Sequence, residues 1–217
     1  MPPTILFQDQ RFVVINKPAG LPVHSGPSKN PSVEDCFAHL SRRKDGPWLA
    51  HRLDADTAGC LAIALRRTPL IAAQAAFANG TVHKTYWAIV EGTPDEDHGT
   101  ITAPLRRITT PHQGWRMIVD QRAGQSAVTD WKLLGRFNGI SWLELHPRTG
   151  RTHQIRVHCA LLGNPIHGDE RYGTHGGGLH LLARTIHIPL DPPIDATAPP
   201  PAHMRAALEQ CGFRQNP

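Results

Sequence analysis

The feature that most constrains the fold is a turn-forming segment that runs directly into an apolar stretch. Residues 51–60 place a cation, an apolar residue and a carboxylate in a row and then continue as Asp-Thr-Ala-Gly, which favours a turn. The apolar residues that follow, 61–65, have the length and composition of a buried strand. Asp54 is therefore expected just before a buried strand, well held and partly shielded from water. Catalytic acids and ordinary turn acids both occupy such positions, so these residues alone leave both roles open.

The composition is that of a globular protein with a basic surface. The chain has 217 residues, of which 40% are hydrophobic and 19% charged, enough for an ample core. Its net charge of +5 favours polyanionic partners such as nucleic acid, although many basic proteins bind none. No apolar run approaches the ~20 residues of a membrane helix, and the N-terminus lacks the pattern of a signal peptide. We expect a cytoplasmic protein without a membrane partner.

The four cysteines and 14 histidines form no familiar metal-binding motif. The cysteines stand far apart, which argues against a zinc knuckle or redox motif and suits a reducing compartment. His153 and His158 are five residues apart and do not share a helical face, while His167 and Asp169 lack a third ligand at a familiar spacing. We expect no metal, although the abundance of histidine keeps a metal-dependent hydrolase as an alternative.

The order of the expected elements predicts an α+β fold, with a largely antiparallel mixed sheet flanked by helices and loops. Strands are expected at 11–16, 61–65, 82–91, 131–134, 140–146 and 179–188. Helices are expected at 33–43, from Thr68-Pro69 to Asn79-Gly80, at 152–162 and at 202–210. Asn138-Gly139 is typical of the turn in a strand pair. Because no linker separates two cores, we expect a single domain over residues 1–217.

Taken singly, the candidate polar residues have ordinary roles. Asp54 and Asp56 are not expected to act as a close carboxylate pair. Asp56 is expected to be a turn residue. Tyr86 in a strand packs by default into a core with its hydroxyl at the edge. Lys84 is by default exposed to solvent, and Arg156 on a helix is by default a surface cation.

Six blocks in order along the chain resemble the RluA-type pseudouridine synthase family. They are 14–21 (VINKPAGL), 51–59 (HRLD with Thr57 and Gly59), 84–92 (KxYxAxVxG), 99–105 (GxIxxPL), 146–158 (HPxTGRTHQIRVH) and 162–173 (LGxPIxGDxxYG). Together they cover nearly the whole chain. The resemblance implies the family's catalytic fold with a central active-site cleft. It also implies isomerisation of a uridine already built into RNA, without a metal or cofactor.

The resemblance assigns catalytic roles to Asp54, Tyr86 and Arg156. Asp54 is the expected catalytic carboxylate, acting either as a nucleophile or by removing a proton from the sugar, and the sequence leaves both routes open. Arg156 matches the arginine that pairs with this carboxylate, and an adjacent guanidinium typically lowers the pKa of an aspartate by ~1–3 units. Tyr86 matches the tyrosine that packs against the target base.

RNA contacts are expected from Arg52, His51 and Lys84, which stand in the same blocks. A uridine inside a stem or loop has to be flipped out, at a cost of a few kcal/mol. Arg52 matches the arginine that fills the vacated space. The expected partner is a stem-loop of ribosomal or transfer RNA, bound by a monomer.

The chain departs from the family's pattern at two positions. Ala58 stands where Ser or Thr is usual, which removes a hydroxyl beside the catalytic turn. Gln125 stands where a lysine is common, which removes one expected phosphate contact. The Ala58 change keeps open a second hypothesis, an RNA-binding protein that has lost catalysis. Because the catalytic pattern begins with the first expected strand, we expect no separate N-terminal RNA-binding module.

Overall fold

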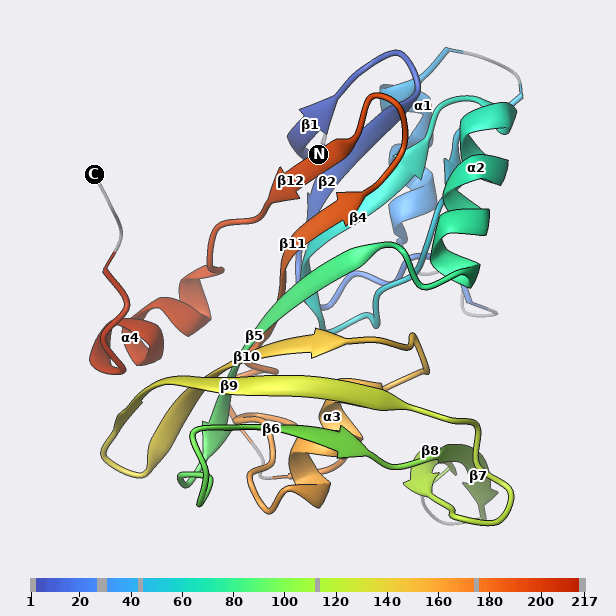
Figure 1. The fold of residues 1–217 in the computed structure, drawn as a ribbon. Helices are drawn as coiled ribbons and strands as arrows, with labels where there is room; N and C mark the ends of the chain where they lie inside the picture. The colour runs from blue at the N-terminus through green and yellow to red at the C-terminus, as the bar shows by residue number, and fades with distance from the viewer. Residues whose placement is uncertain (1–2, 27–30, 43–44, 112–113, 174–175, 215–217) are drawn as a thin grey trace. The chain divides into compact units, whose positions relative to one another are not determined.

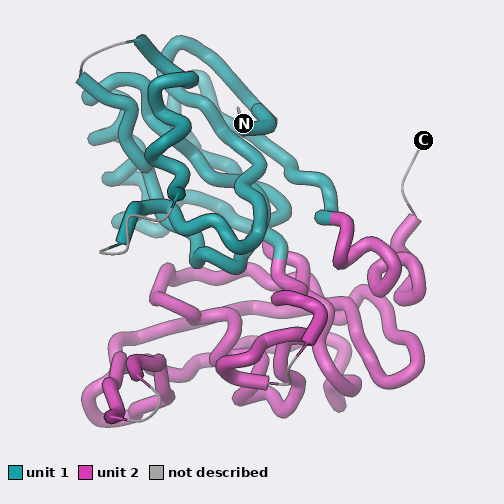
Figure 2. Tube along the Cα trace, turned by 180° about the vertical axis from the view of Figure 1, so that it is seen from behind, with its two compact units in different colours: residues 1–84, 182–201 teal, residues 85–181, 202–217 magenta. Residues whose placement is uncertain are grey.

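The computed structural model describes residues 3–26, 31–42, 45–111, 114–173 and 176–214 (Figure 1). These residues form two compact units (Figure 2). The first unit comprises residues 1–84 and 182–201, and the second comprises residues 85–181 and 202–217. Over the described ranges, every helix is too short or too polar to cross a membrane.

The first unit is built around β4, a strand in which all seven residues are buried. Its neighbours in the sheet are arranged in the order β1-β2-β4-β11-β12, and β3 also pairs with β4. Most pairs are antiparallel, whereas β11 runs parallel to β4. The strands are β1 (Thr4–Gln8), β2 (Phe12–Lys17), β3 (Trp48–Leu49), β4 (Ala58–Ala64), β11 (Leu181–Ile188) and β12 (Ile194–Thr197). The helices are η1 (Val33–Cys36), a 3-10 turn, with α1 (Phe37–Leu40) and α2 (Arg67–Ala78).

The second unit is an antiparallel sheet in the order β5-β10-β9-β6, accompanied by a separate hairpin, β7–β8. The strands are β5 (His83–Glu91), β6 (His98–Thr102), β7 (Leu105–Thr110), β8 (Gly114–Val119), β9 (Val128–Phe137) and β10 (Ile140–Pro147). The helices are α3 (Gln154–Leu161) and α4 (Ala202–Gln210). Ile155 and Cys159 of α3 are buried in one cluster with Leu143 and Leu145 of β10. This contact fixes one face of α3 against the sheet.

The predicted α+β class is confirmed, and so are several local predictions. The buried strand expected at 61–65 is the second half of β4. Asn138 and Gly139 have φ angles of 44° and 83° and connect β9 to β10, as their sequence predicts. The closing helix spans the expected residues 202–210. The expected single domain over the whole chain stays a prediction.

Other local predictions were wrong. The helix expected at 33–43 is only η1 followed by the short α1, and Arg43 lies outside the described residues. None of the four residues of α1 is buried, so no apolar face stabilises a longer helix. Helix α2 begins at Arg67 rather than at a Thr68 cap, since Pro69 fits within a first turn whose N–H groups need no helical partner. Strand β1 was not expected.

Gly59 is the glycine that the first sheet requires. Its φ is +114°, and a Cβ at this position would overlap the backbone of Ala183 on the parallel neighbour β11. Gly80 after α2 has a φ of +70° and open space around it. Both positions disfavour a side chain, but only Gly59 adds a steric overlap.

Gly59→Ala is expected to lower the free energy of unfolding by about 2 kcal/mol more than Gly80→Ala, because the overlap adds to the shared cost of positive φ. Urea denaturation of both variants and the wild type measures the difference. Equal losses in the two variants would show that β4 and β11 do not approach this closely.

Candidate active site

Asp54 opens the tight turn that leads into β4. The N–H of Thr57 donates a hydrogen bond to the Asp54 carbonyl oxygen at 3.2 Å, which closes the turn over Ala55 and Asp56. Asp56 is exposed at the turn and Thr57 is buried, while Asp54 is partly buried. The expected turn position of Asp56 is confirmed, and Asp54 lies in the turn just before the buried strand β4, as predicted.

A buried lysine holds this turn. The side chain of Lys17, at the end of β2, is 0% exposed, and its Nζ donates hydrogen bonds to the carbonyl oxygens of Pro18, Leu21 and Ala55 at 2.8, 2.7 and 2.6 Å. Gly20 N–H donates to the same Ala55 oxygen at 2.9 Å. One ammonium group thus joins the end of β2, the loop that follows it and the turn that carries Asp54.

Lys17 also sets the electrostatics of the turn. Burial lowers the pKa of Lys17 to about 8, and attraction to the carboxylates of Asp56 and Asp54 acts in the opposite direction. The attraction is mutual, so the protonated lysine favours the ionised form of Asp54. Sequence reasoning gave Lys17 no role, although a lysine that ends an apolar strand before Pro-x-Gly was a usable signal.

Two expected RNA-binding residues are Arg52, two positions before Asp54, and Lys84 on β5. Arg52 is exposed, whereas Leu53 after it is buried. Lys84 is half-buried, and its burial lowers its pKa. Neither observation tests an RNA contact, and both assignments stay predictions.

His51 serves the fold of the first unit. Its Nε2 accepts a hydrogen bond from Ala62 N–H at 3.0 Å, and its ring lies 5.0 Å from that of Phe77. Burial, and after it the charge of Lys84, lowers the pKa of His51 to about 3, so the ring is neutral near pH 7. A contact between His51 and RNA stays a prediction, and this ring would bring no positive charge to it.

Tyr86 and Arg156 belong to the second unit. Tyr86 lies on β5, half-buried, and packs against the cluster that includes Ile155 and Leu145. Arg156 lies on α3 and is 5% exposed, so it is not the surface cation that a helix position suggests by default. The expected approach of Arg156 and Tyr86 to Asp54 involves residues of both units and stays a prediction.

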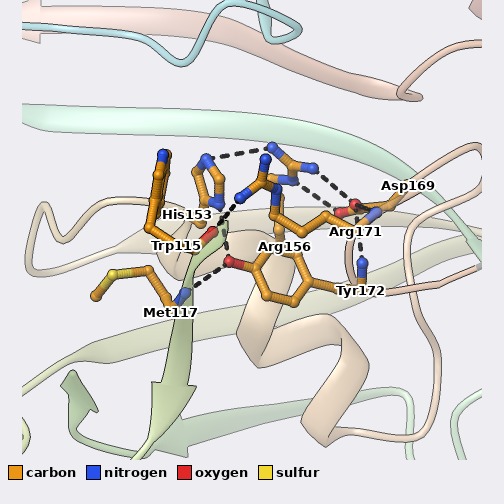
Figure 3. A network of polar contacts seen from close by, with 7 residues as sticks. All are labelled: Trp115, Met117, His153, Arg156, Asp169, Arg171 and Tyr172. Atoms are coloured by element: carbon orange, nitrogen blue, oxygen red, sulfur yellow. Dashed lines mark hydrogen bonds and ion pairs between the residues drawn. The ribbon is translucent and has the colours of Figure 1, made fainter. Parts of the chain in front are cut away.

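Arg156 is held by Asp169 in a buried ion pair (Figure 3). Arg156 Nε donates to Asp169 Oδ2 at 2.8 Å and Nη2 donates to Oδ1 at 2.7 Å, which is a bidentate geometry. Asp169 Oδ1 also accepts the backbone N–H groups of Arg171 and Tyr172 at 3.0 and 3.2 Å. Sequence reasoning weighed Asp169 only as a metal ligand and missed it as the partner of Arg156.

His153 precedes α3 in a left-handed conformation, with a φ of 52°. Its Nδ1 lies 2.8 Å from Tyr172 Oη, and its Nε2 lies 3.4 Å from Arg156 Nη1. Burial, and after it the charges of Arg156 and Arg171, lowers the pKa of His153 to about 3. Because Arg156 can only donate, the neutral ring accepts at Nε2 and carries its proton on Nδ1.

The histidine hypothesis for a metal gains no support. Over the described ranges, no group of three or more His, Cys, Asp or Glu side chains is arranged to hold a metal ion. His167 Nδ1 lies 2.6 Å from Glu91 Oε1, and Asp169 is engaged with Arg156, so the expected pair has separate partners.

The two departures from the family pattern occupy different surroundings. Ala58 is 2% exposed on β4, opposite Leu182, where a hydroxyl would need a buried partner. Gln125 is exposed at the base of the β7–β8 hairpin, where its backbone forms hydrogen bonds of 2.8 and 2.9 Å with Leu105.

Comparison with known proteins identifies the family. The model of the RNA pseudouridylate synthase family matches residues 11–161, which include Asp54, Tyr86 and Arg156. The chain belongs to this family. An uncharacterized RNA pseudouridine synthase of Zymomonas mobilis is 45% identical over 173 residues, which cover 79% of this chain and 78% of that protein. The structure of human RNA pseudouridylate synthase domain containing 4 has a TM-score of 0.81 at 28% identity and covers 98% of this chain and 94% of that chain.

A third comparison is with ribosomal large subunit pseudouridine synthase D of Zymomonas mobilis. It is 34% identical over 194 residues, and the alignment covers 86% of this chain and 61% of that protein. The predicted resemblance to RluA-type pseudouridine synthases is thereby confirmed, and so are the enzyme class and the fold. This pseudouridine synthase carries Asp54 on a lysine-held turn in one unit and Arg156 in a buried ion pair in the other.

Lys17→Met gives a pH test of the buried ammonium. Because the folded pKa, about 8, lies below the usual 10.5, the unfolded chain binds more protons between these values, and stability rises with pH in that window. The wild type should therefore gain about 2 kcal/mol relative to Lys17→Met between about pH 7 and about pH 9.5. Urea denaturation across this range measures the gain. Lys132→Met, which removes an exposed lysine, should show none.

Asp169→Asn should lower the free energy of unfolding by about 3 kcal/mol, because it removes the charge of the carboxylate that makes the bidentate contact with the buried Arg156 guanidinium. Asp130→Asn is the matched control. Asp130 makes the same bidentate contact with Arg148, at 2.6 and 2.8 Å, but that arginine is exposed, so only a small fraction of the loss is expected. Equal losses in thermal or urea denaturation would contradict the stabilising role of the buried pair.

Proposed function

We propose that this pseudouridine synthase isomerises a specific uridine in structured RNA, with Asp54 as the catalytic carboxylate and the uridine flipped out of its stem or loop. The observation that carries the proposal is the family match over residues 11–161, which spans the turn of Asp54 as well as Tyr86 and Arg156. The partly buried position of Asp54, beside a buried cation, supports a reactive carboxylate over a simple turn acid.

The reaction needs an ionised carboxylate. The bond between C1′ and N1 of the uridine breaks, the uracil turns, and a bond forms between C1′ and C5. C5 loses its proton and N1 gains one, so the product is an isomer of the substrate. Asp54 acts either by attack on an electrophilic carbon or by removing a proton from the sugar. In both routes the ammonium of Lys17 favours the charged form that is required.

The remaining residues have supporting roles in this proposal. Tyr86 stacks on the uracil, since a turning base keeps its flat face while its edge contacts change. Arg156 pairs with Asp54 and keeps it charged and oriented. Arg52, exposed two residues before Asp54, fills the space that the flipped uridine leaves. Lys84, with His51 beside it, contributes to the RNA-binding surface.

We propose a stem-loop of ribosomal or transfer RNA as the substrate. The net charge of +5 is consistent with such a polyanion, and the 34% identity to ribosomal large subunit pseudouridine synthase D favours ribosomal RNA. Action in the cytoplasm and as a monomer belongs to the same proposal. Mapping of pseudouridine in total RNA from a strain that lacks the protein, before and after incubation with it, identifies the target. No new pseudouridine under several salt conditions would overturn the proposal.

Asp54→Asn should lower turnover by about a thousandfold or more and leave RNA affinity within about threefold, because it removes the charge and keeps the shape. Release of tritium from RNA labelled at C5 of uridine measures turnover, and filter binding measures affinity. Asp56→Asn, two residues away at the exposed turn, is the matched control and should keep turnover within about twofold. Turnover of Asp54→Asn at the level of the control would remove Asp54 from its role. If the wild type binds RNA and releases no tritium, the RNA-binding hypothesis holds instead.

A further inference from the structure

A single phenol oxygen joins the β7–β8 hairpin to the helix that carries Arg156. Tyr172 Oη accepts the backbone N–H of Met117, on β8, at 3.0 Å. The same oxygen lies 2.8 Å from Nδ1 of His153, the residue that precedes α3 (Figure 3). Burial raises the pKa of Tyr172, so the phenol stays neutral near pH 7. One hydroxyl group therefore links β8 to the residue before α3, although these segments are far apart in the sequence.

Tyr172 also contacts the Arg156 guanidinium through its ring. Arg156 Cζ lies 5.3 Å from the centre of the Tyr172 ring, within the range of a cation–π contact. The backbone N–H of Tyr172 donates to Asp169 Oδ1, the oxygen that accepts Arg156 Nη2. The hydroxyl also acts on Arg156 through His153. It orients the His153 ring, and that ring accepts a hydrogen bond from Arg156 Nη1 at 3.4 Å. A shift of Tyr172 would disturb each of these contacts.

Two exposed arginines lie on the Trp115 ring of β8, one from β7 and one from the loop after α3. Arg107 and Arg171 place their Cζ atoms 4.7 and 4.8 Å from the centre of the Trp115 ring, and both arginines are exposed. The Trp115 ring lies 4.9 Å from the ring of His153. Trp115 thus connects two solvent-facing guanidinium groups to the residue that contacts Arg156. A phosphate backbone bound by these arginines would therefore act on the contacts of Trp115 with His153.

We propose that Tyr172 is a positioning residue through which the β7–β8 hairpin holds the Arg156 guanidinium. RNA bound at Arg107 and Arg171 would then order the arginine of the reacting site. This inference rests on the proposed function, because it takes Arg156 as the partner of the catalytic carboxylate. A Phe at position 172 would fill the same space but could not accept Met117 N–H or orient His153. The lost acceptor explains why a Tyr is needed here.

Tyr172→Phe tests the role of the oxygen. We expect kcat to fall about tenfold while KM for the RNA stays within about twofold, because RNA can still bind to a hairpin whose link to Arg156 is broken. Thr149→Val is the matched control: Thr149 Oγ1 also accepts a strand N–H, from Val128 at 3.1 Å, and bonds to Gln154 at the start of α3. It should lower the melting temperature to a similar degree and leave kcat within about twofold. An unchanged kcat in Tyr172→Phe would overturn the proposal.

A double-mutant cycle tests the link to the hairpin. Arg107→Gln and Arg106→Gln each remove one exposed charge from adjacent positions of β7, but Arg106 pairs with Asp120 at 2.7 Å while Arg107 lies on Trp115. The effect of Arg107→Gln on kcat should shrink at least about threefold in the Tyr172→Phe background, and that of Arg106→Gln should be the same in both backgrounds. Additive effects of Arg107→Gln and Tyr172→Phe would contradict the coupling.

A readout without turnover separates this inference from the proposed function. In protein with ¹⁵N-labelled arginine, Tyr172→Phe should speed exchange of the Arg156 Nε proton at least about fivefold and leave that of Arg148, in its exposed pair, unchanged. Exchange of the Met117 amide should rise as well. If wild type makes no pseudouridine, the proposed function fails and this measurement still decides whether Tyr172 positions Arg156. Unchanged Arg156 exchange in the variant would overturn the inference.

Discussion

The buried ammonium of Lys17 is the interaction on which the first unit's site depends. Removing a charge from water is costly, and here the cost is offset by three carbonyl oxygens at 2.6 to 2.8 Å and by two nearby carboxylates. Backbone carbonyls cannot move away without disturbing the chain that carries them. The ammonium therefore fixes the backbone of the turn next to Asp54, and its charge favours the form of the carboxylate that the reaction uses.

The second unit also buries a cation, and it stabilises that cation with a carboxylate instead of carbonyl oxygens. The buried Arg156 guanidinium is bound by the Asp169 carboxylate, and that carboxylate is in turn fixed by two backbone N–H groups from residues 171 and 172. A planar guanidinium needs a partner with two oxygens in one plane, which Asp169 supplies. In both units a buried cation is thus oriented by groups whose own positions are set by the backbone.

Much of the fold follows from local patterns in the sequence. The apolar run 61–65, the Asn138-Gly139 turn and helix α4 were all predicted, because each depends on periodicity or on the φ preference of its own residues. The prediction of a helix at 33–43 was wrong because helix propensity without a buried face does not stabilise a helix of that length. Strand β1 is stabilised by its antiparallel pairing with β2, and the pattern of its own five residues does not predict that pairing.

The sequence by itself determined the family, the order of the elements and the candidates Asp54, Tyr86 and Arg156, because ordered motifs survive as residue types at fixed spacings. Only the tertiary structure assigned the partners: Lys17 to the turn of Asp54, Asp169 to Arg156, and Tyr172 between β8 and the start of α3. Lys17 and Ala55 are 38 positions apart, and Met117 and Tyr172 are 55 apart. Burial and hydrogen bonding act through distance in space, so contacts of this kind are decided by how strands pair and not by neighbours along the chain.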